Sequence, residues 1–212
     1  RSTLFPYTTL FRSTNLNGNI DTDKLKKARV TVLGLGGLGS NVACMLARSG
    51  VGSLHLVDFD TVEVGNLNRQ QYDIRHIGMK KCEALRAVLK YINPFLSIKT
   101  EDIKITEENI LKLVKHSDYI CEALDSPESK AMVVSEILGN YPEKIVVAAS
   151  GMAGLSSANN IKTRCAMKNL YVVGDEISGT DEIDIMMAPR VTACAAHEAN
   201  LIIRHILGKE NL

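Results

Sequence analysis

Residues 30–40 read Val-Thr-Val-Leu-Gly-Leu-Gly-Gly-Leu-Gly-Ser, and this stretch decides the fold. The apolar run at 29–33 predicts a strand, and a helix-like run at 41–48 follows the glycines. Glycine has no Cβ, so the backbone can turn tightly and come close to a bound phosphate. The N–H groups at the start of the next helix would point at the same phosphate. We therefore predict a phosphate-binding turn with these glycines: Gly34, Gly36, Gly37 and Gly39.

A second apolar strand supports a nucleotide as the ligand. Residues 53–57 lead into Asp58, about 20 residues beyond the glycines, where a nucleotide-binding unit has its ribose-binding acid. A glycine cluster alone is often only a turn. Strand, glycines, helix, strand and acid in this order predict nucleotide binding.

Strands and helices alternate along most of the chain. Further strands are predicted at 97–103, 118–123 and 145–149, and helices at 22–27 and 79–91 and after residues 106 and 126. This alternation predicts an α/β fold of the Rossmann-like, doubly wound kind, with a mainly parallel sheet and helices on both faces. Beyond Gly151 a pair of strands at 161–163 and 170–173 and a closing helix at 191–207 predict an antiparallel C-terminal extension.

The length of 212 residues fits one sizeable α/β domain. Residues 1–13 contain a near repeat, Arg1-Ser2-Thr3-Leu4-Phe5 and Thr9-Leu10-Phe11-Arg12-Ser13, and join no periodic pattern downstream. We interpret 1–13 as a non-native segment and 14–212 as a single domain. The alternative is a native arm that packs on a partner subunit.

Composition narrows the function classes. The net charge is +1, from 25 basic and 24 acidic residues, which gives no support to nucleic acid or a membrane surface as the main partner. No apolar run approaches the roughly 18 residues of a spanning helix, and the start lacks the pattern of a secretion signal, so we expect a cytoplasmic protein. The five cysteines are too far apart for a Cys-x-x-Cys zinc pair or a disulfide framework. Cys165, beside Arg164, is the best candidate for a reactive thiolate, although a core or surface thiol is the simpler interpretation.

Three charged residues near the ends of the predicted strands have no role in hydride transfer, the reaction of a dehydrogenase. Arg69 lies in a polar loop beyond Asp58, Lys81 lies at the start of a helix, and Asp125 follows the strand at 118–123. Ligands of open α/β sheets bind beyond the carboxyl ends of the strands, so these three side chains can converge on phosphates. Two cations and a carboxylate that holds Mg²⁺ suit phosphoryl or nucleotidyl transfer. Alternatively each is a surface residue, and Asp125 caps a helix.

The joint pattern resembles the ThiF/MoeB/HesA family, the bacterial relatives of ubiquitin-activating enzymes. The resemblance covers about residues 24–208. It rests on the glycine turn and on these stretches: Asp58-x-Asp60, Asn66-Leu67-Asn68-Arg69-Gln70, Ile77-Gly78 with Lys81, Ile92-Asn93-Pro94, and Asp125. Four further stretches resemble the short ThiF-type branch of thiamine biosynthesis: 122–125, 149–154, 173–175 and 189–191.

The resemblance implies an adenylyltransferase that uses ATP and Mg²⁺ to activate the C-terminal glycine of a small ubiquitin-like sulfur carrier protein ending in Gly-Gly. It also implies a homodimer. The glycines would bind ATP, Asp58 the ribose hydroxyls, and Asn66, Arg69 and Lys81 the phosphates, while Asp125 would hold Mg²⁺.

The chain departs from the family pattern in two places. Many members have two Cys-x-x-Cys zinc pairs near the C-terminus, and this sequence has none, so we predict no structural zinc. Many also carry an N-terminal arginine that reaches into the partner subunit's ATP site, and neither Arg12 nor Arg29 can be given that role.

Three functions remain open at this stage. The first is adenylation of a ThiS-like carrier for thiazole synthesis. The second is the same chemistry on a molybdopterin-type carrier or a modified tRNA base, although the balanced charge disfavours RNA. The third is a nucleotide-binding protein without turnover, or a conventional NAD enzyme.

Overall fold

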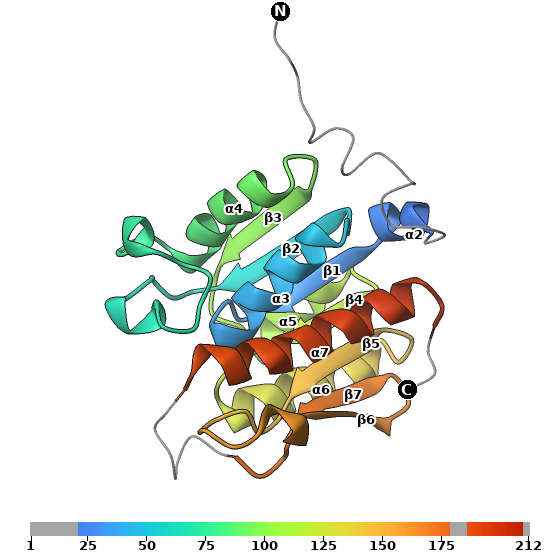
Figure 1. Cartoon of the computed structure of the whole chain (residues 1–212). Helices are drawn as coiled ribbons and strands as arrows, with labels where there is room; N and C mark the ends of the chain where they lie inside the picture. Colours follow the sequence, from blue (N-terminus) through green and yellow to red (C-terminus); the bar gives the residue numbers. More distant parts are fainter. Residues whose placement is uncertain (1–20, 179–185, 210–212) are drawn as a thin grey trace, which may run out of the picture.

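The computed structural model describes residues 21–178 and 186–209, and the interpretation of 1–13 lies outside these ranges. Figure 1 shows one twisted sheet of seven strands in the order β3-β2-β1-β4-β5-β7-β6. The strands are β1 (Arg29–Leu33), β2 (Ser53–Asp58), β3 (Ser97–Asp102), β4 (Tyr119–Glu122), β5 (Ile145–Ala149), β6 (Lys162–Met167) and β7 (Leu170–Gly174). The predicted α/β, Rossmann-like sheet is confirmed.

The strand order places a topological switch point between β1 and β4. The chain runs from β1 outward to β2 and β3, and then returns to β4 on the other side of β1, with parallel pairing throughout. In open α/β sheets ligands bind at such a point, beyond the carboxyl ends of the strands. The glycine turn follows β1, so it lies at this point.

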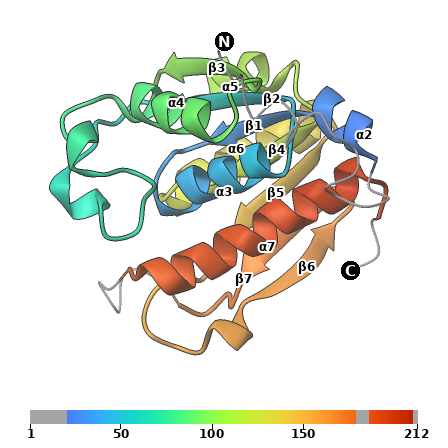
Figure 2. The same cartoon turned by 45° about the horizontal axis from the view of Figure 1, so that its top comes forward.

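Helices cover both faces of the sheet (Figures 1 and 2). One face carries α3 (Gly37–Arg48), α4 (Lys81–Ile92) and α7 (Ala188–Ile206), and the other carries α5 (Glu107–Val114) and α6 (Pro127–Asn140). A short helix, α2 (Thr22–Lys27), precedes β1. Two apolar clusters match the two faces: one includes Val32, Leu56 and Ile202, and the other includes Leu33 and Ile137. Central strands are apolar on both sides because both sides are covered.

The helices α3 and α4 begin at residues other than those predicted. The pattern predicted a helix at 41–48, but α3 begins at Gly37, so part of the glycine turn is its first turn. The helix predicted at 79–91 begins at Lys81, because Lys80 pairs with Thr61 in an isolated antiparallel bridge. The apolar Met79 fits the helical pattern, and this pattern carries no information on a pairing with a residue as distant as Thr61.

The C-terminal extension is antiparallel, as predicted. β6 pairs with β7 in antiparallel register, and β7 itself runs parallel to β5. β6 extends to Met167, beyond the predicted strand at 161–163, and its pairing with β7 continues past a register shift between Cys165 and Met167. The closing helix α7 begins three residues before the predicted Val191, with Pro189 in its first turn, where proline is well tolerated.

No helix in residues 21–178 and 186–209 is long and apolar enough to cross a membrane.

Helix α7 carries a fully buried carboxyl group, that of Glu198. Glu198 is 0% exposed, and neither of its oxygens has a hydrogen-bond partner among the residues that the structure describes. Burial raises the pKa of Glu198 well above its ordinary value, Lys130 lowers it in part, and Glu122 raises it. A carboxyl group without a partner is far less costly to bury when it is protonated.

This carboxyl should make stability depend on pH. The pKa of Glu198 is higher in the folded protein than in the unfolded chain. Its favourable contribution to the free energy of unfolding is therefore complete below the pKa of the unfolded chain, about 4.3, and is lost as the pH rises through the pKa of the folded protein. We expect Glu198→Gln, which cannot ionise, to gain stability relative to the wild type as the pH rises, by up to about 1.4 kcal/mol per pH unit. Urea unfolding of both proteins at several pH values from 4 to 9 measures the difference. A pH-independent difference would contradict this account.

Candidate nucleotide site

The glycine turn after β1 is packed too closely for larger residues. Gly34 has a φ of +87°, and a Cβ there would lie 2.6 Å from the carbonyl oxygen of Ala123, at the end of β4. A Cβ on Gly39 would overlap the carbonyl oxygen of Gly34, and one on Gly37 would lie 2.9 Å from Val191 Cγ1. Gly36 is the N-cap residue of α3. These glycines bring the start of α3 next to the ends of β1 and β4, and the N-terminal N–H groups of a helix are suited to an anion.

Asp58, at the end of β2, stabilises the glycine turn by hydrogen bonds. Its Oδ2 accepts from Leu35 N at 2.6 Å, and its Oδ1 accepts from Asp60 N at 2.7 Å. Burial raises the pKa of Asp58, and these two N–H donors oppose that shift. A carboxylate oxygen has a second lone pair, so both oxygens can still accept from a hydroxyl group.

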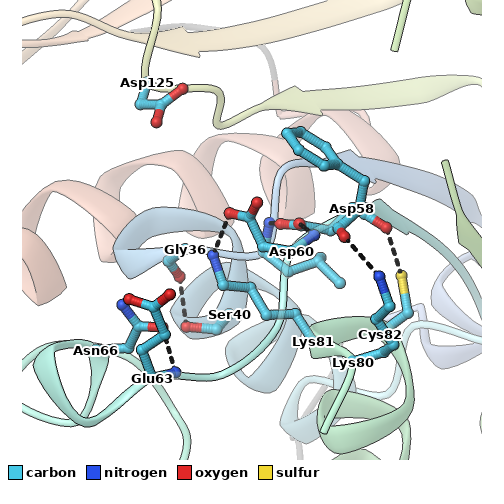
Figure 3. Close-up of polar contacts among 12 residues, drawn as sticks. Gly36, Ser40, Asp58, Asp60, Glu63, Asn66, Lys80, Lys81, Cys82 and Asp125 are labelled. Atoms are coloured by element: carbon cyan, nitrogen blue, oxygen red, sulfur yellow. Dashed lines mark hydrogen bonds and ion pairs between the residues drawn. The ribbon is translucent and has the colours of Figure 1, made fainter. Parts of the chain in front are cut away.

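Lys81 is a buried cation beside the turn. Its side chain is 8% exposed, and its Nζ lies 2.7 Å from Asp60 Oδ2 (Figure 3). The position of Lys81 as the first residue of α4 aims its ammonium back toward the end of β2. Asp60 belongs to the quoted Asp58-x-Asp60 pattern, but no role was predicted for it. Sequence spacing alone could not identify it as the partner of a lysine 21 residues away.

Arg69 and Asn66 lie in the loop between β2 and α4. The Arg69 guanidinium donates to the carbonyl of Gly65 and to Asn68 Oδ1, both at 2.9 Å, and its stem lies against Gly37. Asn66 Oδ1 accepts from Glu63 N at 3.0 Å and closes a short 3₁₀ turn at Val64–Asn66. The loop also bonds to α3, because Asn41 Nδ2 donates to the carbonyl of Arg69. Arg69 is therefore held over the start of α3.

Asp125 is exposed in the connection between β4 and α6 (Figure 3). Its Oδ1 accepts from its neighbour Ser126 N at 2.9 Å, whereas the N-cap of α6 is Ser126, whose Oγ accepts from Ser129 N. The capping interpretation of Asp125 therefore loses its main support. The carboxylate is free to face a ligand at the switch point.

The predicted residues surround one edge of the sheet. The glycines, Asp58 and Asp125 come from the ends of β1, β2 and β4, and Arg69 and Lys81 flank them. Within the described residues no group of three or more His, Cys, Asp or Glu side chains is placed to hold a metal ion. A Mg²⁺ site built from one protein carboxylate and nucleotide phosphates needs no such group, so Asp125 fits that ion.

Arg190 is a buried anchor that sequence reasoning did not identify. At the start of α7, it donates to the carbonyl oxygens of Ser156 and Ser157 and pairs with Asp175. Asp175 N in turn donates to the carbonyl of Gly151. Three of the stretches that resemble the short ThiF-type branch, 149–154, 173–175 and 189–191, thus form one contact network.

The cysteines give no sign of catalytic chemistry. Four are buried: Cys44, Cys82, Cys121 and Cys194. Burial raises the thiol pKa of each, to about 12 for Cys44 and Cys82. Cys165 is exposed on β6, but its neighbour Arg164 pairs with Glu176. Arg164 is thus engaged by a carboxylate, which does not favour the reactive-thiolate interpretation of Cys165.

Comparison with known proteins gives the family. Residues 10–212 match the ThiF family. A segment of 130 residues, 61% of the chain, is 38% identical to the adenylyltransferase and sulfurtransferase UBA4 of Candida glabrata, of which it covers 30%. A segment of 121 residues, 56% of the chain, is 37% identical to the molybdopterin-synthase adenylyltransferase of Haemophilus influenzae, of which it covers 48%. The matches therefore span less than half of either relative.

Solved structures agree on the fold. The crystal structure of the E. coli tRNA N6-threonylcarbamoyladenosine dehydratase TcdA in complex with ATP matches with a TM-score of 0.82 at 22% identity, over 96% of this chain and 94% of that one. E. coli MccB in complex with succinimide matches with a TM-score of 0.71 at 24% identity, over 90% of this chain and 59% of that one. The family match extends over nearly the whole sequence, and the chain belongs to the ThiF family.

Proposed function

We propose that this protein uses ATP and Mg²⁺ to adenylate the C-terminal carboxylate of a small ubiquitin-like carrier protein. Family membership supports an adenylyltransferase, and the two curated relatives described above are adenylyltransferases. The observation that carries the proposal is the buried Lys81 ammonium beside a glycine turn at the switch point. A buried cation at that place suits a polyphosphate, and hydride transfer to NAD has no use for it.

The chemistry follows from placing ATP phosphates against the start of α3. The carrier's terminal carboxylate attacks the α-phosphorus, the bond to the bridging oxygen breaks, and pyrophosphate leaves as an acyl-adenylate forms. The attacking carboxylate is already an anion at neutral pH, so no general base is required. Lys81 and Arg69 neutralise charge that develops on the phosphates, and Asn66 and the turn glycines orient them.

Asp58 and Asp125 complete the proposed site. Asp58 accepts the ribose hydroxyls with its remaining lone pairs, while its N–H contacts keep the turn in place. Asp125 holds Mg²⁺, which neutralises phosphate charge. Lys81 can keep its bond to Asp60 while it donates to a phosphate, because an ammonium group has three N–H donors.

For the carrier we infer a ThiS-like sulfur carrier of thiazole and thiamine synthesis. The Arg190 network joins the stretches that resemble the short ThiF-type branch, and this is what supports the choice. A molybdopterin-type carrier is the second candidate, because of the similarity to the molybdopterin-synthase adenylyltransferase. We further propose a cytoplasmic homodimer without structural zinc.

ATP–pyrophosphate exchange tests this function. Purified protein should exchange labelled pyrophosphate into ATP only when a carrier ending in Gly-Gly is present. A ThiS-like carrier, a molybdopterin-type carrier and a tRNA substrate, tested in parallel, separate the candidates, and a carrier without its last glycine is the control. No exchange with any acceptor would refute adenylation.

The choice of nucleotide is a separate prediction. By calorimetry we expect ATP to bind with millimolar or tighter affinity and NAD far more weakly. Asp58→Asn should weaken ATP binding by about 1–3 kcal/mol, because a ribose hydroxyl then loses a charged acceptor. The melting temperature must be checked in parallel, since Asp58 also supports the turn. Equal affinities for ATP and NAD would overturn the assignment.

A further inference from the structure

A second buried carboxylate lies at the end of β4, close to the proposed metal ligand. Glu122 is 0% exposed, although the strand that carries it ends at the functional edge of the sheet. Lys130 of α6 lies 3.2 Å and 3.1 Å from its two oxygens. A buried carboxylate is stable only when its charge and lone pairs are satisfied, and Lys130 supplies the charge.

The remaining contact of Glu122 reaches the connection to α6. Glu122 Oε1 accepts from the backbone N–H of Leu124 at 2.7 Å. The N–H of Ala123 is bonded to the carbonyl of Leu33 in β1, and that of Ser126 to Asp125 itself. Regular pairing thus ends at Ala123, and Glu122 holds the next residue, immediately before Asp125.

The same connection touches the glycine turn. A Cβ on Gly34 would lie 2.6 Å from the carbonyl oxygen of Ala123, so the two backbones are in close contact. A displacement of residues 123–125 would move Asp125 relative to the turn. A distance change of this kind at a metal ligand weakens binding, because Mg²⁺ tolerates little departure from its preferred geometry.

We infer that Glu122 is a positioning residue: held by Lys130, it fixes the Leu124 N–H and so sets where Asp125 meets the nucleotide-bound Mg²⁺. This inference rests on the proposed function. Glu122 itself is completely buried and would not touch the substrate.

Two double variants isolate the contact. Glu122→Gln/Lys130→Met keeps an oxygen that can accept from Leu124, whereas Glu122→Leu/Lys130→Met has none. Both remove the ion pair together, so neither leaves a buried charge alone, and apolar replacement of a buried pair is often tolerated by the fold. Glu198→Gln is a control for the loss of an equally buried carboxyl whose oxygens make no hydrogen bond to this connection, and whose link to Glu122 and Lys130 is electrostatic only.

The measurement is calorimetric affinity for a non-hydrolysable ATP analogue with and without Mg²⁺, below the melting temperature of each variant. We expect Mg²⁺ to strengthen binding to the wild type, to Glu198→Gln and to the Gln/Met variant by similar factors. In the Leu/Met variant that factor should fall about tenfold, as expected for the loss of one hydrogen bond.

The outcomes separate the two proposals. Equal Mg²⁺ factors in the Gln/Met and Leu/Met variants would overturn the role of Glu122. A wild type whose binding Mg²⁺ does not strengthen would refute the proposed metal site instead. Affinity without Mg²⁺ should be unchanged in both double variants, and a loss there would show a general disturbance of the site.

Discussion

Replacing Lys81 with alanine should lower ATP–pyrophosphate exchange by about two to three orders of magnitude, the usual effect of removing a charge that stabilises a transition state. Its ammonium is the buried cation of the site, and Asp60 already holds it beside the turn. The fold should survive, because the described ion pair of Lys81 is with Asp60, whose side chain is 46% exposed. Initial rates of ATP–pyrophosphate exchange at saturating carrier concentration measure the effect.

The neighbouring lysine provides a matched control. Lys80 has the same charge and is one residue away, but it is exposed and bonds to the carbonyl of Phe59 and to Asp102. Lys80→Ala should keep exchange within a few-fold of the wild type. Lys81→Met, which preserves most of the side-chain volume, should be as inactive as Lys81→Ala. Exchange near the wild-type rate in either Lys81 variant would remove this residue from the mechanism.

Arg69→Ala should lower exchange to a similar extent. The stem of Arg69 lies against Gly37 at the start of α3, and its guanidinium bonds to the backbone of Gly65 and to the neutral Asn68. No carboxylate therefore has to be displaced before its guanidinium can bind a phosphate. A near wild-type rate would show that Arg69 only organises the loop.

The sequence predicted the fold well where apolar runs were short and clearly bounded. The strands at 29–33 and 145–149 were predicted at their observed bounds, because both are apolar runs in the centre of a parallel sheet. The glycine-rich start of α3 was missed, since glycine has a low helix propensity. Tertiary contact explains its presence there: Gly37 lies against Val191 and Gly39 against Gly34.

The residues of the candidate site could be named from motifs, but not their partners. Asp60, Glu122 and Arg190 form ion pairs with Lys81, Lys130 and Asp175, and the partners lie 21, 8 and 15 residues apart in the sequence. Hydrophobic periodicity carries no information on such pairings. The motifs therefore predict which groups face a ligand, and the structure adds which groups hold them.

The proposed metal ligand, Asp125, gives the other large expected effect. Asp125→Asn should abolish Mg²⁺-dependent pyrophosphate exchange, because an amide lacks the charge that attracts a hard divalent cation. The melting temperature should hardly change, since Asp125 is exposed and its one described hydrogen bond is to its own neighbour, Ser126. Exchange assays over a range of Mg²⁺ concentrations and thermal unfolding measure the two quantities.

Ser126→Ala is the matched control, because it changes the next residue and removes the real N-cap of α6. Loss of a cap costs about 1 kcal/mol and lowers the melting temperature of a domain of this size by roughly 2–4 °C. Exchange should then persist in Ser126→Ala at temperatures where the protein is folded. The two variants thus predict opposite pairs of results: an inactive protein of normal stability, and an active protein of reduced stability. An active Asp125→Asn protein at ordinary Mg²⁺ concentrations would exclude Asp125 as the metal ligand.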